Sequence, residues 1–318
     1  MAAMWKIWRV IQLIAALVGV VAFGITYFLR ATPAAVKPGS QPPLAAAALP
    51  PKLVRLTEMR PGIFFNSITL PGPKDEQRVL GVYLPKAAMT QRNLPCVIIA
   101  PAGTRLFHGI DLSNGDVEEH LPYVKAGYMV VSYSLDGAIP KRKEQNKQAI
   151  QKAQAAFIAV NGGVNNGKTA ITYAIERLHA DPKRIVVAGH SSAATLALQL
   201  ATADPRVSAC IAYAPCINLE ARMGEDLDQL DRLNPGAKAF FHSTSPWNNV
   251  VKLHCPVFLF HARDDSNVPF SESESFAQAL KQAGGKVNFV TADSGDHYDS
   301  MIQQGIPAAQ KWLAQRAW

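Results

Sequence analysis

The chain has 318 residues, of which 48% are hydrophobic and 18% charged, a composition that fits one sizeable core and excludes a disordered or fibrous protein. Six lysines and arginines stand before the first acidic residue, Glu58, and without them the net charge of +8 falls to +2 over residues 58–318. The positive net charge therefore does not indicate an acidic partner. No basic stripe with interleaved aromatic residues is present, so we expect no nucleic-acid binding.

An apolar segment at residues 10–29 contains only Gln12 and Thr26 as polar residues. As a helix, about 20 residues span about 30 Å, the thickness of a bilayer core, and aromatic residues stand at both ends. We therefore expect residues 1–30 to form an N-terminal transmembrane helix, with the membrane as a partner. A cleaved signal peptide is the alternative, disfavoured by the length of the segment and by Arg30 directly after it.

The charges beside this segment predict its orientation. The basic residues before it, with the terminal amine, outweigh those after it, which places the N-terminus in the cytoplasm and the following domain outside it. Residues 31–57 are rich in proline and alanine. We expect them to form a semi-rigid spacer, followed by a globular domain at residues 58–318.

The globular part begins with alternating apolar runs at Phe64–Leu70 and Arg78–Leu84, separated by a PGPKDE turn, which predicts an antiparallel hairpin. Short apolar strands then alternate with helical patterns. We expect strands at residues 96–100, 128–134, 184–189, 207–214, 256–261 and 286–292. We expect helices at residues 117–126, 167–180, 193–203, 272–283 and 306–315. This alternation predicts an α/β fold with a mostly parallel central sheet flanked by helices on both faces.

Two long connections interrupt the alternation, at residues 135–166 and 217–250, and we expect the second to form a small cap near the carboxyl ends of the strands. The four cysteines have no C-x-x-C spacing, so no metal site is expected. If the strand predicted at residues 207–214 continues to Cys216, the six residues from Cys210 span roughly 20 Å, too far for a disulfide. We interpret all four as buried small residues, with a bridge between neighbouring strands as the alternative if the domain is exported.

The segment RIVVAGHSSAATLALQLA places Ser191 between a predicted strand and a predicted helix. A serine in this strand–turn–helix context is typical of a nucleophile elbow, whose sharp turn needs small neighbours. Gly189 is such a neighbour, and Ala193 stands where a second glycine is more usual. The pattern predicts Ser191 as a nucleophile.

A serine nucleophile needs a base, and the base needs an orienting acid. Asp265 follows the strand within PVFLFHARDDSNVP, and His297 follows the next strand, within KVNFVTADSGDHYDSM. Each of the three residues therefore ends its own strand, in the order serine, aspartate, histidine. We predict the triad Ser191, Asp265 and His297, and expect the neighbouring Asp264 to point elsewhere.

Residues from about 62 to 316 resemble the α/β-hydrolase superfamily, in the branch shared by dienelactone hydrolases and the catalytic domains of prolyl-oligopeptidase-type peptidases. The resemblance rests on the segments AGYMVVSYS, DPKRIVVAGHSSAA, SPW…CPVFLFHARDDSNVP and the GDH turn before the last helix. In the family pattern H-G-x-x-D-x-x-V-P, Asp265 falls on the acid and Ala262 replaces the glycine. The family offers no catalytic role for His254 or His261, which we expect to be structural.

Acyl transfer also requires donors for the developing oxyanion. The resemblance implies the backbone N–H of Ser192 and a second donor from the loop after residues 96–100. Pro101 has no N–H, so this second donor is expected at Ala102 or Gly103. The family's common His-Gly is missing there. Within the cap, we expect Phe240, Phe241 and Trp247 to line an apolar substrate pocket.

The residues and the resemblance together predict a serine hydrolase that cleaves a small-molecule carboxylic ester through an acyl-enzyme, without metal or organic cofactor. A peptidase acting on short peptides is the alternative, although the chain has no room for the large β-propeller of prolyl oligopeptidases. Gly162–Thr169 matches the phosphate-loop pattern G-x-x-x-x-G-K-[ST] but follows a helical pattern instead of a strand. A nucleotide-binding protein and a non-catalytic, membrane-anchored binding protein stay open as remote alternatives.

Overall fold

The computed structural model of the protein describes residues 35–50, 56–72, 77–103, 106–112, 117–139, 146–316 and 318. The transmembrane helix expected over residues 10–29 lies outside these ranges. Among the described residues, no helix combines the length and the hydropathy needed to cross a bilayer.

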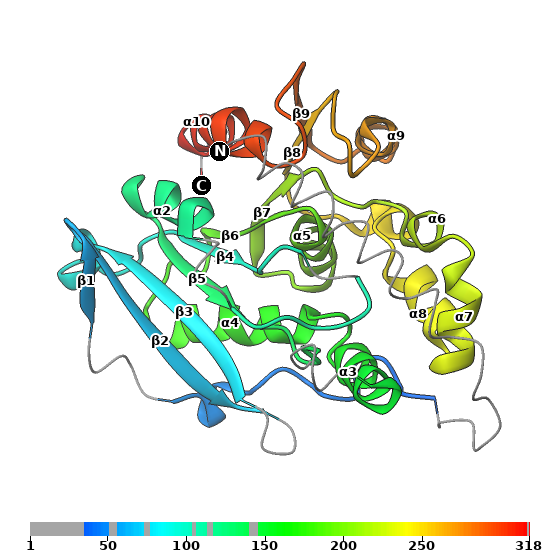
Figure 1. Cartoon of the computed structure of the whole chain (residues 1–318). Coiled ribbons are helices and arrows are strands. Elements are labelled where there is room, and N and C mark those ends of the chain that lie inside the picture. The colour runs from blue at the N-terminus through cyan, green and yellow to red at the C-terminus, as the bar shows by residue number, and fades with distance from the viewer. Residues whose placement is uncertain are drawn as a thin grey trace, which may run out of the picture. The chain divides into compact units, whose positions relative to one another are not determined.

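A nine-stranded sheet forms the centre of the described domain, in the order β1-β2-β3-β5-β4-β6-β7-β8-β9 (Figure 1). Its strands are β1 (Thr57–Arg60), β2 (Ile63–Pro71), β3 (Gln77–Pro85), β4 (Cys96–Ile99), β5 (Met129–Tyr133), β6 (Ile185–His190), β7 (Val207–Tyr213), β8 (Val257–Ala262) and β9 (Val287–Ala292). The first three strands are antiparallel, β3 pairs antiparallel with β5, and all later pairs are parallel. The hairpin and the mostly parallel sheet predicted from the sequence are confirmed.

Helices cover both faces of this sheet. They are α2 (Val117–Lys125), α3 (Lys147–Ala159), α4 (Val164–Glu176), α5 (Ser192–Ala203), α6 (Leu219–Met223), α7 (Asp226–Leu233), α8 (Ala237–Thr244), α9 (Phe270–Gln282) and α10 (Ile306–Ala314). On β4, Cys96 and Ile98 pack into a core with α4, α5 and α9, whereas Val97 and Ile99 pack into a second core with α2 and α10 (Figure 1). Because successive side chains of a strand point to opposite faces, a strand buried on both faces is apolar throughout.

Helices lie within both long connections. Residues 135–166 contain α3, and residues 217–250, the region expected to form a cap, contain α6, α7 and α8. The four cysteines are buried free thiols, so the inter-strand disulfide is not formed. β1 was not expected from the sequence, because its four residues, three of them exposed, carry little periodic signal.

Residues 35–50, expected to belong to a spacer, are instead bound to the folded domain. The backbone N–H of Leu44 donates to the Thr169 hydroxyl at 2.9 Å, and the guanidinium of Arg177 donates to the carbonyl oxygens of Ala46 at 2.7 Å and Pro50 at 3.1 Å. Leu49 is buried in the core. The spacer prediction is therefore wrong for this segment, since side chains from α4 supply the partners that its irregular backbone needs.

The Gly162–Thr169 segment does not form a phosphate loop. Gly163 has a left-handed φ of 90°, and α4 begins at the next residue, so most of the motif is helical. The Thr169 hydroxyl is buried and donates to the carbonyl oxygen of Asn165 at 3.0 Å. The backbone N–H groups that would cradle a phosphate are in helical turns instead, so most of this segment is the first part of α4.

A buried ion pair fixes the loop after β5. The Arg78 guanidinium on β3 donates to the two carboxylate oxygens of Asp136, with Nε–Oδ1 at 2.9 Å and Nη2–Oδ2 at 2.6 Å. Asn166 on α4 donates to the same Oδ1 at 2.8 Å. Because these hydrogen bonds satisfy the buried carboxylate, they hold the loop that carries Leu135 toward the pocket described below.

Candidate active site

Ser191 lies on a sharp turn between β6 and α5. Its backbone has φ 56° and ψ −123°, a conformation that a non-glycine residue adopts only under strain, and its N–H donates to the carbonyl oxygen of Tyr213 at 2.8 Å. A Cβ on Gly189 would lie 2.3 Å from the backbone carbon and oxygen of Ala193, so position 189 requires glycine. The methyl group of Ala193 is accommodated in the core. The geometry is that of the predicted elbow.

Asp265 and His297 meet beyond the carboxyl ends of β8 and β9. These strands are parallel neighbours, with Ala262 paired to Ala292, so the loops that follow them leave the sheet side by side. His297 Nδ1 lies 2.8 Å from Asp265 Oδ2. An ionised carboxylate only accepts hydrogen bonds, so Nδ1 carries the proton and Nε2 is left as the basic atom of the ring. Within the described part of the chain, His297 Nε2 has no hydrogen-bond partner.

The Asp265 carboxylate is almost completely buried, with 1% of its side chain exposed. Burial raises the pKa of this carboxyl, but hydrogen bonds from His261, His297 and the N–H of Val268 outweigh burial and hold the pKa well below its usual range. The backbone N–H groups of Asn267 and Val268 donate to Oδ1 at 2.8 and 2.9 Å. Asp265 is therefore an ionised acceptor that orients the ring of His297.

His190, which was not predicted from the sequence as a site residue, links the turn at Ser191 to the loop that carries His297. Its ring lies 4.5 Å from the ring of His297, and its Nε2 lies 2.8 Å from the carbonyl oxygen of His297. Burial lowers the pKa of His190 to about 3, and the neighbouring His297 also lowers it, so the ring is neutral and Nε2–H donates. The residue beside Ser191 thus holds the backbone of His297 in place.

Asp264, beside Asp265 in the sequence, binds the backbone of the loop that carries His297. Its carboxylate accepts hydrogen bonds from the N–H groups of Gly295 and Asp296 at 3.1 and 2.9 Å. The Asp296 carboxylate in turn accepts from the N–H and the hydroxyl of Ser266, both at 2.8 Å. The loop after β8, which carries Asp265, and the loop after β9, which carries His297, therefore donate hydrogen bonds to each other.

The two other histidines singled out from the sequence have different surroundings. His254 is exposed, which fits the absence of a catalytic role. His261 is fully buried, as a structural histidine would be, but its Nε2 lies 3.0 Å from Asp265 Oδ2. A histidine within the apolar strand VFLFHA was the only sign in the sequence of this contact.

The two expected oxyanion donors leave neighbouring strands. Ser192 is the first residue of α5, and Ala102 and Gly103 follow β4, which pairs in parallel with β6. Ile99 at the end of β4 is paired with Ala188, so the β4 loop leaves the sheet beside the elbow. This topology supports both backbone positions as candidates for the oxyanion hole, with Ala102 and Gly103 still alternatives.

A small pocket adjoins the elbow, and residues of α6 and α8 contribute to its lining. Its volume is about 20 Å³, room for a water molecule or a methyl group. It is lined by Leu106, Leu135, Phe157, Gly162, Ser192, Thr195, Leu196, Gln199, Leu219, Phe240 and Thr244. Of the three aromatic residues expected here, Phe240 lines the pocket. Phe241 is buried in the core, and Trp247 is 41% exposed on the surface, so the prediction is wrong for these two.

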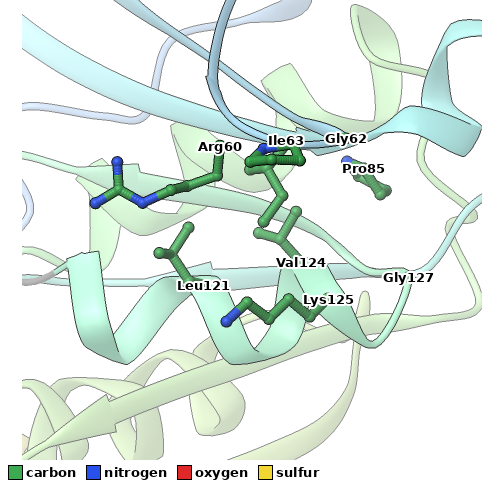
Figure 2. A pocket seen from close by; sticks show the side chains of 9 residues that line it. Arg60, Gly62, Ile63, Pro85, Leu121, Val124, Lys125 and Gly127 are labelled. Carbon is green, nitrogen blue, oxygen red and sulfur yellow. The ribbon is translucent and has the colours of Figure 1, made fainter.

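A larger hollow lies between the β1–β2 turn and α2 (Figure 2). Its volume is about 490 Å³, and the apolar side chains of Ile63, Leu121 and Val124 line it with Arg60 and Lys125 at its side. The described residues that line it include no serine, cysteine, histidine or carboxylate.

Two family models match the chain. The acetyl xylan esterase (AXE1) model matches residues 64–225, slightly more than half of the chain, and the prolyl oligopeptidase family model matches residues 160–317. A probable isoprenylcysteine alpha-carbonyl methylesterase from Oryza sativa subsp. japonica is 34% identical over 74 residues. That match covers 21% of this chain and only 18% of the relative's length.

Several solved structures share the fold. Acetyl xylan esterase 1 from Thermoanaerobacterium sp. JW/SL YS485 has a TM-score of 0.60 at 17% identity, over 85% of this chain and 90% of that chain. A putative dienelactone hydrolase from Klebsiella pneumoniae has a TM-score of 0.57 at 18% identity, over 80% and 99%. The acylaminoacyl peptidase of Pyrococcus horikoshii has a TM-score of 0.61 at 15% identity, but this chain, with 79% of its residues aligned, spans only 42% of that peptidase.

Proposed function

Because this chain belongs to the α/β-hydrolase superfamily, in the branch of the dienelactone hydrolases and prolyl-oligopeptidase-type peptidases, and is a serine hydrolase, we propose that it cleaves small carboxylic esters through Ser191. The observation that carries the proposal is the arrangement at the elbow. Ser191 has a strained backbone, Asp265 holds His297, and His190, next to Ser191, lies with its ring centroid 4.5 Å from that of His297. A small pocket that Ser192 helps to line adjoins the elbow.

In the proposed mechanism, His297 Nε2 accepts the hydroxyl proton of Ser191 as Oγ attacks the ester carbonyl carbon. Asp265 accepts the Nδ1–H of the imidazolium and stabilises its charge. The N–H of Ser192 and one N–H of the loop at residues 102–103 stabilise the oxyanion. His297 then protonates the leaving alkoxide, and water attacks the acyl-enzyme by the same steps in reverse.

The size of the pocket supports an acetyl-sized acyl group. Ser192 and Thr195 of α5 lie on one side of it and Phe240 of α8 on another, so a carbonyl bound at Ser191 has little room for a longer chain there. The match to the acetyl xylan esterase model over residues 64–225 agrees with this size. We therefore propose a short-chain acyl ester as the substrate class, without assigning the alcohol.

A peptidase is the second candidate, favoured by the prolyl oligopeptidase match, which spans the segment from the elbow to His297. The two functions separate on substrates that release the same kind of chromophore. We expect p-nitrophenyl acetate to be hydrolysed and alanine p-nitroanilide to give no detectable turnover at the same enzyme concentration, after the rate of a Ser191→Ala variant is subtracted. A rate enhancement over buffer that is larger for the anilide would favour the peptidase.

Shortening Phe240 tests the acyl pocket. Phe240→Ala enlarges the cavity beside Ser192, so we expect the kcat/KM ratio of p-nitrophenyl hexanoate to acetate to rise by about 10-fold, since one methylene in an apolar pocket changes specificity by about 10-fold or more. Phe241→Ala is the matched control, because this ring is buried in the same core beside Phe240 but does not line the pocket. Each substitution should lower stability by about 3–5 kcal/mol, and Phe241→Ala should leave the chain-length ratio unchanged. If the hexanoate-to-acetate ratio is the same in both variants, the acyl group does not bind in this pocket.

We also propose that residues 10–29 anchor the domain in a membrane, with the N-terminus cytoplasmic and the catalytic domain extracytoplasmic. The support is the uninterrupted apolar segment and the charges beside it. A cleaved signal peptide stays the alternative.

A further inference from the structure

A second buried histidine binds the carboxylate that orients His297. His261 lies near the end of β8, and its side chain is 0% exposed. Its Nε2 lies 3.0 Å from Asp265 Oδ2 and 3.1 Å from the carbonyl oxygen of Val268. On the other side of the ring, Nδ1 lies 2.7 Å from the hydroxyl oxygen of Ser273 on α9.

The partners of His261 determine where its proton lies. Asp265 Oδ2 and the carbonyl oxygen of Val268 only accept hydrogen bonds, so Nε2 must carry a proton that they share. In the neutral ring Nδ1 is then an acceptor, and the Ser273 hydroxyl donates to it. The buried Ser273 therefore fixes the ring in the tautomer that donates to Asp265.

This arrangement gives Asp265 Oδ2 two imidazole donors. His297 Nδ1–H donates at 2.8 Å and His261 Nε2–H at 3.0 Å, while Oδ1 is held by two backbone N–H groups. Four hydrogen bonds leave the carboxylate no freedom to rotate away from His297. A donor from His261 also neutralises part of the negative charge on Oδ2, so His297 faces a weaker acceptor than it would without it.

We propose that His261, fixed by Ser273, is a positioning residue that holds Asp265 Oδ2 against His297 Nδ1 and moderates the charge that His297 faces. The proposal rests on the proposed function, in which His297 is the general base. The titratable groups that face the ring are Asp265 on the following loop, His297 on the loop after β9 and His190 at the end of β6. The ring centroid of Phe270 also lies 5.8 Å from that of His261.

The test uses variants that separate the donor from the volume of the ring. His261→Leu removes the donor, whereas His261→Gln retains an N–H at a comparable reach. Ser273→Ala removes the group that fixes the tautomer, and Ser275→Ala, at an exposed position of the same helix, is its matched control. Each full-length variant is assayed for kcat and KM on p-nitrophenyl acetate across pH, and the ring titration of His297 is followed by NMR.

We expect His261→Leu to lower kcat by about 10- to 100-fold with KM nearly unchanged, in line with the loss of other orienting partners. The acid limb of its kcat/KM profile should move to higher pH, because a more negative Oδ2 holds the imidazolium more tightly. His261→Gln should recover most of kcat, Ser273→Ala should fall between, and Ser275→Ala should equal wild type. The His297 titration midpoint should move in the same direction as the acid limb.

Unchanged kcat and an unmoved acid limb in folded His261→Leu would overturn the proposal, and so would a Gln variant as slow as the Leu variant. If His261→Leu does not fold, a Ser273→Ala variant indistinguishable from Ser275→Ala in kcat and in His297 titration would also overturn it. The NMR titration needs no substrate. If the wild type hydrolyses no ester, a shifted His297 midpoint in His261→Leu would therefore support the positioning role while the proposed function fails.

Discussion

Ser191→Ala should reduce kcat for p-nitrophenyl acetate by about 10⁴-fold or more, because the variant lacks the atom that forms the acyl-enzyme. Alanine has no larger side chain than serine, so the turn with φ 56° and the packing of Gly189 against Ala193 are retained. The melting temperature should therefore stay close to that of wild type.

Ser271→Ala is the control for this substitution, because Ser271 is exposed on the first turn of α9, away from the elbow. Its kcat should equal that of wild type. Ester hydrolysis that survives in folded Ser191→Ala would mean that another group attacks the carbonyl carbon, and the proposed mechanism would then be wrong.

Asp265→Asn is expected to lower kcat by about 10³- to 10⁴-fold without unfolding the domain. The amide keeps one oxygen, which the backbone N–H groups of Asn267 and Val268 bind, so its NH₂ group is turned toward His297 and His261. Nδ1 of His297 must then accept, and its proton moves to Nε2. In that tautomer the ring has no basic atom for the hydroxyl of Ser191.

Asp293→Asn is the matched control, since the Asp293 side chain is 98% exposed and its oxygen lies 3.5 Å from Arg263. An exposed ion pair of this kind contributes little to the free energy of unfolding, so kcat and stability should be unchanged. Equal activity of Asp265→Asn and Asp293→Asn would show that His297 needs no orienting carboxylate.

The sequence predicted that Asp265 and His297 lie together, because each follows a strand of strong apolar pattern, and the hydrogen bond between them agrees with this. Their action as a triad with Ser191 stays a prediction. Gly189 marks the turn by local sterics, and chain order then places Asp265 and His297 on adjacent parallel strands, whose ends meet at one edge of the sheet. Such features depend on neighbours in the chain or on the order of the strands, both of which can be read from a single sequence.

The residues that line the pocket could not be predicted from the sequence in this way. Phe240 and Phe241 are adjacent on α8 and both are buried in the core, but the turn of about 100° between successive helical residues brings only the Phe240 ring to the lining of the pocket. The direction of that turn depends on how the cap packs. Likewise, Arg177 binds the carbonyl groups of residues 46–50 from far along the chain, so the composition of the segment alone suggested a spacer.

The contacts of His190 and His261 were not predicted from the sequence, for a different reason. Each is a polar residue inside a strand that is buried on both faces, and a buried imidazole requires hydrogen-bond partners. The sequence indicated that partners must exist, but only the register of β6, β8 and β9 showed that they are His297 and Asp265.

The most direct test of the account is to treat the folded protein with a fluorophosphonate and to locate the adduct by peptide mass spectrometry. The proposed mechanism predicts one adduct, on Ser191, formed more slowly in Asp265→Asn and absent from Ser191→Ala. A folded protein that forms no adduct, or that carries it on another serine, would contradict the central claim.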